Sequence, residues 1–214
     1  MRAYFQHFGG GTVTSEGMRD FYLEYFSARA PEDPALAQAL EGPIAALDWD
    51  RLWHAPGLPE YTPPCDGAPL EEAQRLAALW LRVGTDAAAL EGFSSGDVEG
   101  WSTLMSTVFL DALLEGEATL SPTACERMAG LYGFLASNCE LRVRFLQACL
   151  RARWSGAVDS AVELATTQGR MKFTRPIYRS LKSYDAKLAR DTFLKHRGIY
   201  HPVCAKMVAQ DLEV

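Results

Sequence analysis

The segment that decides the fold runs from Asn138 to Pro176 and reads NCELRVRFLQACLRARWSGAVDSAVELATTQGRMKFTRP. Asn138 can cap the first turn of a helix, and Glu140 then lies near the positive end of that helix. A second helix follows, because apolar residues recur at i, i+3, i+4 and i+7, which places them on one helical face. These residues are Val158, Ala161, Val162 and Ala165.

The same helical period continues outside this segment. It recurs in three further sets: Leu76, Leu79, Trp80 and Val83; Met105, Val108, Phe109 and Ala112; Met128, Leu131, Tyr132 and Leu135. Ser121-Pro122 and His201-Pro202 are typical helix starts, since a proline in the first turn loses no hydrogen bond. The connections are short, and short links make neighbouring helices antiparallel. We therefore predict an all-α fold, a right-handed superhelix of stacked antiparallel helix pairs like armadillo or HEAT repeats.

The N-terminal third has a different pattern. Gly9-Gly10-Gly11 breaks any helix begun at Met1, and a second helix is expected from about Thr14 to Ala28. Residues 56–69 hold five of the eleven prolines, which excludes regular helix, and are interpreted as an ordered Pro-rich crossing. The alternative is a mobile linker. The predicted division is 1–28, a connector with this crossing over 29–69, and a helical-repeat domain over 70–214.

Composition narrows the class of protein. Of the 214 residues 48% are hydrophobic, and 21 basic against 27 acidic residues give a net charge of −6. That range is typical of a globular chain, and the acidic balance argues against a nucleic-acid partner. Five widely spaced cysteines indicate reduced thiols and a cytoplasmic protein. No apolar run is long enough for a membrane span, and Met1 to Phe8 lacks a signal-peptide core.

The turn from Gln168 to Pro176 is the most informative motif. We expect Gly169 to end the preceding helix in a left-handed conformation, and a new helix to start near a capping Thr174. Arg170 and Lys172 then face one side of an extended connector, beside the positive end of that helix. Two such cations suit a carboxylate or another small anion. The alternative from the residues alone is a solvated basic turn.

Motifs for autonomous catalysis are missing. A thermolysin-like zinc helix needs His-Glu-x-x-His, whereas His196 and His201 are five apart with no glutamate between them. His201 and Cys204 could ligate a metal in principle, but no second ligand pair accompanies them. The sequence also has no Gly-x-Ser-x-Gly elbow and no phosphate-binding loop. We predict that this chain binds no cofactor and supplies no catalytic residue.

Several stretches resemble the C-terminal domain of the leukotriene A4 hydrolase and aminopeptidase family. Asp48-Trp49-Asp50-Arg51-Leu52-Trp53, followed by Pro56-Gly57-Leu58-Pro59, is similar to a family segment, as is Glu140-Leu141-Arg142-Val143-Arg144-Phe145-Leu146. The run from Ala165 to Pro176 matches the leukotriene A4 hydrolase branch almost residue by residue. His201-Pro202-Val203 and Asp211-Leu212 complete the resemblance.

The resemblance implies a helical domain that packs against a thermolysin-like zinc catalytic domain in the same chain. It implies that Arg170 and Lys172, with Met171 between them, bind the carboxylate of a peptide or fatty-acid-like substrate. The family's zinc would belong to the catalytic domain. Residues 1–28 resemble the stretch where that domain hands over to the C-terminal one.

The departures from the family pattern leave two functions open. The zinc helix and the third zinc ligand are missing, residues 30–46 look longer than the usual connector, and Glu60 replaces a frequent proline. The chain is therefore expected to be a fragment, a truncated product, a subunit, or a domain used alone. It either lines the substrate tunnel of a zinc aminopeptidase or epoxide hydrolase, or it is a stand-alone helical-repeat scaffold that binds proteins.

Overall fold

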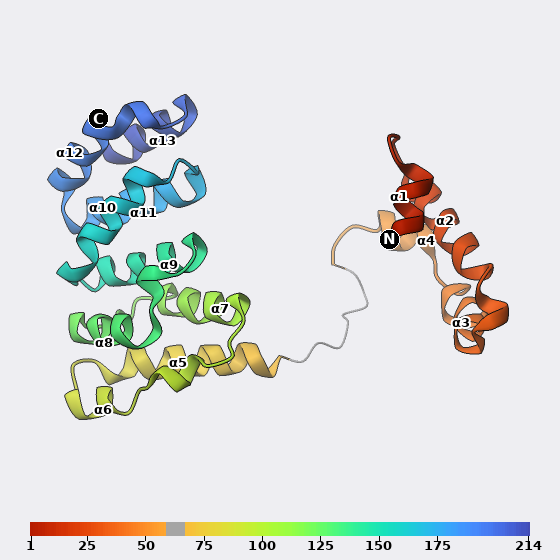
Figure 1. The fold of residues 1–214 in the computed structure, drawn as a ribbon, viewed down its shortest axis with the longest axis horizontal. Helices are drawn as coiled ribbons and strands as arrows, with labels where there is room; N and C mark the ends of the chain where they lie inside the picture. The colour runs from red at the N-terminus through yellow and green to blue at the C-terminus, as the bar shows by residue number, and fades with distance from the viewer. Residues whose placement is uncertain (59–66) are drawn as a thin grey trace. The chain divides into compact units, whose positions relative to one another are not determined.

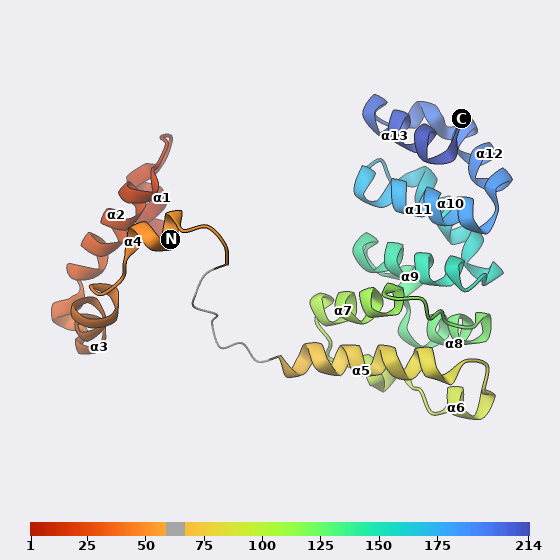
Figure 2. The same cartoon turned by 180° about the vertical axis from the view of Figure 1, so that it is seen from behind.

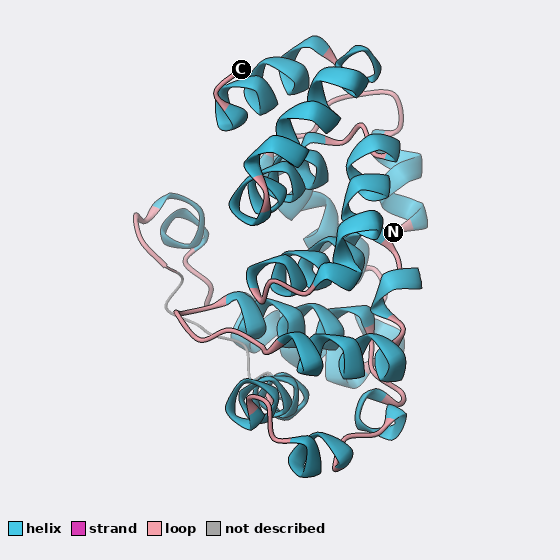
Figure 3. Ribbon diagram, turned by 90° about the vertical axis from the view of Figure 1, so that its left-hand side faces the viewer, coloured by secondary structure: helices cyan, strands magenta, loops and turns pink. Residues whose placement is uncertain are grey.

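The computed structural model describes residues 1–58 and 67–214, and every regular element within them is a helix (Figure 1, Figure 3). The prediction of an all-α fold is confirmed. The chain divides into two compact units, Met1–Pro64 and Cys65–Val214, which are described separately. Most of the predicted Pro-rich crossing, residues 59–66, lies outside the described residues. None of the described helices is long and apolar enough to cross a bilayer.

The second unit is a stack of helices. Its α-helices are α5 Ala68–Val83, α6 Ala87–Glu91, α7 Thr103–Leu114, α8 Pro122–Tyr132, α9 Cys139–Arg151, α10 Val158–Thr167, α11 Met171–Tyr184, α12 Ala186–His196 and α13 Pro202–Leu212. The odd-numbered helices form one layer in which α5 packs on α7, α7 on α9, α9 on α11 and α11 on α13 (Figures 1 and 2). Helix α10 packs against α9 and α11, and α12 packs against α11 and α13.

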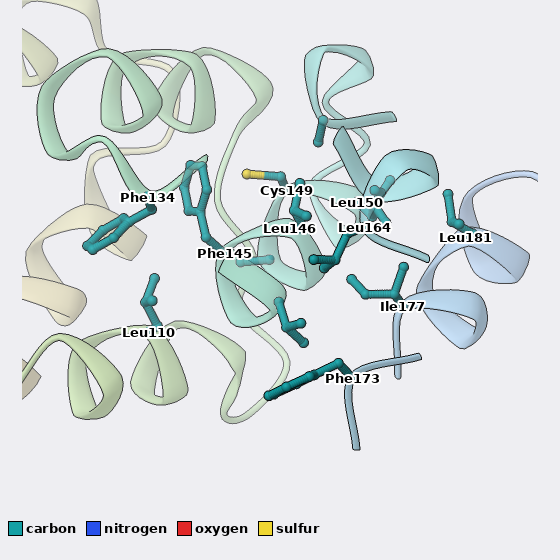
Figure 4. Close-up of a cluster of buried hydrophobic side chains, with 14 of the residues drawn as sticks. Leu110, Phe134, Phe145, Leu146, Cys149, Leu150, Leu164, Phe173, Ile177 and Leu181 are labelled. Carbon is teal, nitrogen blue, oxygen red and sulfur yellow. The ribbon is translucent and has the colours of Figure 1, made fainter. Parts of the chain in front are cut away.

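One continuous core runs through this stack. Helices α5, α7, α9, α11 and α12 each bury one large ring completely, namely Trp80, Phe109, Phe145, Tyr178 and Phe193. Around them lie aliphatic side chains of α9, α10 and α11 (Figure 4). Removing that much apolar surface from water is the main stabilising term of the fold. One residue of the predicted stripes departs from this pattern, because Leu79 is 41% exposed. Ala73 and Ala77 share the buried face of α5 with the tryptophan instead.

Three predicted helix caps are confirmed. Oγ of Ser121 accepts a hydrogen bond from the Ala124 amide at 3.1 Å, at the start of α8. The side chain of Asn138 caps α9 through the amides of Glu140 and Leu141. At α13, Nδ1 of His201 accepts from the amide of Val203 at 3.3 Å. His201 therefore serves as the cap of α13.

Basic side chains also bond the C-terminal ends of neighbouring helices. The guanidinium of Arg151 donates to the carbonyls of Leu114 and Gly116, where α7 ends. Arg153 donates to the last carbonyls of α11, and Arg190 donates to Leu212 at the end of α13. These carbonyls lack partners within their own helices and carry partial negative charge. The cations therefore connect neighbouring helices of the stack.

The first unit contains shorter elements. They are α1 Arg2–Phe8, α2 Ser15–Ser27, a 3-10 turn Ala30–Glu32, α3 Pro34–Ala39, a π-helical turn Leu40–Ile44 and α4 Trp49–His54. Helix α2 agrees with the predicted helix and is capped by Thr14. Aromatic side chains of α1 and α2 contact each other, as Phe8 does Phe21, yet no described side chain of this unit is fully buried. The short helices lie where we expected an irregular connector, and the three-part domain division stays a prediction.

Candidate functional site

The turn between α10 and α11 differs from the predicted turn. Helix α10 ends at Thr167, and α11 already begins at Met171, with Arg170 as its N-cap residue. The expectation of a helix start at Thr174 is wrong, and Gly169 does not have the left-handed backbone we expected. Arg170 and Lys172 therefore do not share an extended connector, because Lys172 lies in the first helical turn.

The physical reason is the burial of Thr174. Its side chain is only 1% exposed, and Oγ1 donates to the carbonyl of Gln168 at 2.9 Å and to that of Arg170 at 3.1 Å. The hydroxyl thus holds the connector onto α11 instead of accepting from an amide. The carbonyl of Arg170 accepts the amides of Phe173 and Thr174, which closes the first turn early.

Arg170 and Lys172 both lie near one buried ring. The guanidinium carbon of Arg170 is 5.4 Å from the ring centroid of Phe173, and Nζ of Lys172 is 5.5 Å from it. Phe173 belongs to the core, while Met171 is 39% exposed. The ring anchors both cations by cation–π attraction, each contact contributing about 0.5–1 kcal/mol at an exposed site.

The two cations differ in their partners. Nζ of Lys172 donates to both carboxylate oxygens of Glu140, at 2.5 and 2.8 Å. The guanidinium of Arg170 forms no ion pair or hydrogen bond with any other residue in the described ranges. Arg170 is thus an exposed, uncompensated positive charge at the N-terminus of α11.

Glu140 belongs to a chain of alternating charges. Nη1 of Arg144 lies 3.1 Å from Oε2 of Glu140, and Nε of Arg144 lies 2.6 Å from Oδ1 of Asp111. Hydrogen bonds from Lys172 and then Arg144 lower the pKa of Glu140. The network connects α11 to α9 and α7, and its two cations and two carboxylates balance each other. Arg170 is outside this balance.

The N-terminus of α11 has no side-chain cap. The starts of α8, α9, α12 and α13, by contrast, are capped by side chains. The first amides of a helix have no intrahelical partner and carry partial positive charge. A small pocket of about 180 Å³ adjoins Lys172. Its lining residues are Asp111, Leu114, Val143, Arg144, Gln147, Lys172, Phe173 and Pro176.

Other candidate chemistry finds no support among the described residues. No three His, Cys, Asp or Glu side chains converge there as metal ligands. Cys125, Cys149 and Cys204 are buried and unpaired, and Cys139 is half-buried; Cys65 lies outside the described residues. Burial raises the pKa of the Cys149 and Cys204 thiols, which disfavours the thiolate that a nucleophile needs.

Comparison with known proteins identifies the family. The family model of the leukotriene A4 hydrolase C-terminal domain matches residues 101–212, which include α7 to α13 and the whole site. The chain belongs to this family. The match to the leukotriene A4 hydrolase C-terminal family includes both the helices α7 to α13 and the turn before α11.

Curated relatives and solved structures support the same family. The chain is 34% identical to leucine aminopeptidase 2 of Aspergillus fumigatus and 33% identical to leukotriene A-4 hydrolase of Xenopus laevis. These alignments cover 98% and 100% of this chain but 32% and 33% of the relatives, so the chain spans about a third of their length. A structure of native yeast leukotriene A4 hydrolase superposes with a TM-score of 0.78 at 25% identity, covering 100% of this chain and 35% of that one.

Sequence reasoning missed the partners of the site. Glu140 was interpreted only as a favourable charge near a helix N-terminus, yet it is the anion that pairs with Lys172 from 32 residues away. Arg144 and Asp111 had no local signal. Only the packing of α9 between α7 and α11 brings these side chains together.

Proposed function

We propose that this chain is the C-terminal helical domain of a leukotriene A4 hydrolase-like zinc aminopeptidase. In this proposal it lines part of the substrate tunnel, and Arg170, Met171 and Lys172 bind the carboxylate of a peptide or fatty-acid-like substrate. The observation that carries the proposal is the free guanidinium of Arg170 at the uncapped start of α11. The described residues do not fit a zinc site, so in this proposal the metal would be held by a catalytic domain other than these 214 residues.

Each residue has a distinct part in the proposed clamp. Arg170 offers a planar pair of N–H donors that matches the two oxygens of a carboxylate, and nothing within the described residues competes for it. Lys172 offers a mobile point charge that already pairs with Glu140, so a substrate carboxylate must displace Glu140 or share the ammonium group with it. Met171 is exposed between them and provides an apolar contact for the carbon chain next to the carboxylate.

The relatives support the wider assignment. Leucine aminopeptidase 2 and leukotriene A-4 hydrolase are about three times as long as this chain, which leaves room in them for a catalytic part. We therefore propose a catalytic domain in cis or as a separate subunit as the partner. The free thiols among the described residues support a reducing compartment, and we propose the cytoplasm.

The test uses the matching catalytic domain, expressed separately and mixed with the 214-residue chain. Turnover would be measured with a peptide that has a free C-terminal carboxylate and with the same peptide amidated. Arg170→Ala should lower kcat/KM for the free acid by about 10–150-fold, as expected for a lost charge-assisted contact of about 1.5–3 kcal/mol. The amidated peptide should be affected little.

Arg82→Ala, an exposed arginine of α5, is the matched control and should leave both activities unchanged. Equal turnover of the free acid by the parent chain and Arg170→Ala would refute the clamp. If the catalytic domain gains no activity when the 214-residue chain is added, and the chain instead binds unrelated proteins, the stand-alone scaffold would be the better assignment.

A further inference from the structure

A second and larger pocket lies farther along the same two helices. Its volume is about 530 Å³, within the range of sites for small organic ligands. It is formed by the C-terminal half of α9 and the residues after it, by α11 from Pro176 onward, and by the end of α7. The lining residues are Leu114, Gln147, Leu150, Arg151, Arg153, Pro176, Arg179, Ser180 and Ser183. Three of them are arginines, and none is a carboxylate.

The charges of these arginines are compensated only in part. Arg151 and Arg153 donate hydrogen bonds only to backbone carbonyls, at 2.6–2.9 Å and 3.0–3.4 Å, and these carbonyls carry partial rather than full negative charge. Arg153 also lies 5.1 Å from the ring centroid of Tyr184. Arg179 pairs with Asp211 at 2.8 Å, but the same carboxylate also accepts two hydrogen bonds from Arg175. The pocket is therefore a local positive site on a chain whose net charge is −6.

The backbone conformation of Arg153 also supports a binding role for this pocket. Its φ is 58°, and this residue follows α9 in the left-handed region that helix ends usually reserve for glycine. A side chain is accepted there in spite of the strain, and that side chain reaches the pocket and the end of α11. Backbone strain of this kind is concentrated at functional positions.

We propose that this three-arginine pocket binds a small organic ligand that carries a phosphate group. A guanidinium presents paired donors that match phosphate oxygens, and several of them around one pocket suit a group with two negative charges. Ser180 and Gln147 add neutral hydrogen-bonding groups, and Leu114, Leu150 and Pro176 offer apolar surface to the carbon part of the ligand.

The pocket adjoins the one beside Lys172, with which it shares Leu114, Gln147 and Pro176. The charged lining residues of the two pockets are different, since no charged residue lines both. Lys172 and Arg179 are seven positions apart on α11, which corresponds to about 10 Å along a helix. Binding at the two places can therefore be tested independently.

The experiment is a calorimetric titration of the 214-residue chain with inorganic pyrophosphate, with succinate in parallel, at constant ionic strength set by sodium chloride. We expect saturable binding of one pyrophosphate and much weaker binding of succinate. Arg179→Gln removes an exposed guanidinium and should weaken pyrophosphate binding at least about tenfold. Arg153→Gly keeps the left-handed backbone, removes the guanidinium and should have a similar effect.

Two controls locate the anion. Arg82→Gln on α5 and Arg170→Ala at the clamp should both bind pyrophosphate like the parent chain. A loss of equal size in Arg82→Gln would indicate general electrostatic attraction and overturn the proposal. A loss in Arg170→Ala alone would place the anion at the start of α11, and succinate binding as tightly as pyrophosphate would overturn the phosphate assignment. Circular dichroism of each variant confirms that it is folded before it is titrated.

Discussion

Lys172 of α11 donates to both carboxylate oxygens of Glu140 on α9, so one of the two proposed substrate-binding cations already has an internal anion as partner. In this ion pair the side chain of Lys172 is 50% exposed and that of Glu140 is 35% exposed. A substrate carboxylate that uses Lys172 must therefore displace Glu140 or share the ammonium group with it. Arg170 needs no such exchange.

This competition predicts the effect of Glu140→Gln. The variant removes the internal anion and keeps the shape of the side chain, so affinity for a carboxylate should rise. Exposed ion pairs contribute about 0.2–1 kcal/mol, which sets the gain at up to about fivefold. The measurement is the dissociation constant of a peptide with a free carboxylate, with its amide as control. A fall in affinity would mean that Glu140 positions Lys172 for the substrate.

The ring of Phe173 beneath both cations gives a second prediction. Phe173→Leu keeps an apolar side chain in the core but removes part of the ring volume, so the free energy of unfolding should drop by about 1–3 kcal/mol. The affinity for a carboxylate should also fall, because Arg170 and Lys172 both lose the ring that positions them. Phe145→Leu, a buried ring of α9 with no cation near it in the described residues, should cost stability and leave affinity unchanged.

Two buried tyrosines should respond differently to loss of the hydroxyl. The hydroxyls of Tyr178 and Tyr200 are 2.8 Å apart, and Tyr200 donates to the carbonyl of Ala165 at 2.8 Å, near the end of α10. Tyr200→Phe leaves both the carbonyl and the Tyr178 hydroxyl without a partner and should cost about 1–3 kcal/mol. Tyr178→Phe leaves the Ala165 bond intact and should cost less. Urea unfolding of both variants gives the two free energies of unfolding. Equal losses would contradict the hydrogen-bond chain from Tyr178 through Tyr200 to Ala165.

Asp211 predicts how stability depends on acid. Hydrogen bonds from Arg175, and then from Arg179, lower its pKa to about 2 from the ordinary 3.8. The folded chain therefore binds fewer protons here than the unfolded chain, and stability falls as the pH drops through that interval. The contribution is about 2 kcal/mol and is fully present above pH 4.

Asp211→Asn removes this titration. The variant should be less stable at pH 7, because Arg175 and Arg179 lose their anion, and its stability should change less between pH 4 and pH 2. Guanidinium unfolding at a series of pH values gives both curves. Parallel curves for the two proteins would show that other carboxyl groups cause the acid sensitivity.

The location of the core predicts the outcome of a truncation. All fully buried apolar side chains among the described residues lie between Ala73 and Leu212. A chain of residues 67–214 should therefore unfold cooperatively, with a midpoint close to that of the 214-residue chain. Thermal unfolding followed by circular dichroism measures this. A large drop in the midpoint would show that the first unit stabilises the second.

Local chemistry made much of this fold predictable. Ser121, Asn138 and His201 were identified as caps because a cap depends on residues two or three positions away. Thr174 was misjudged because burial, which the local pattern does not show, turned its hydroxyl toward two carbonyls. The helical period correctly places Trp80 on the buried face of α5 but also places Leu79 there, where the small side chains of Ala73 and Ala77 are found instead.

The candidate site was only half predictable. Arg170 and Lys172 stood out through their spacing and through the family resemblance, because both cues are contained in the local sequence. The ion pair of Lys172 with Glu140 and the three-arginine pocket depend on which helices are neighbours in the stack. Such contacts between residues about thirty positions apart leave no period or motif in a single sequence.

The order of the odd-numbered helices has a consequence for how the chain would respond to mechanical load. Because α11 packs between α9 and α13, Arg170 and Lys172 at its start do not belong to the last helix of the stack. Pulling on the C-terminus would peel away α13 and α12 first, as the end of a stack that is held by nearest-neighbour contacts frays first. Arg170 and Lys172 would keep their geometry until that fraying reached α11 itself.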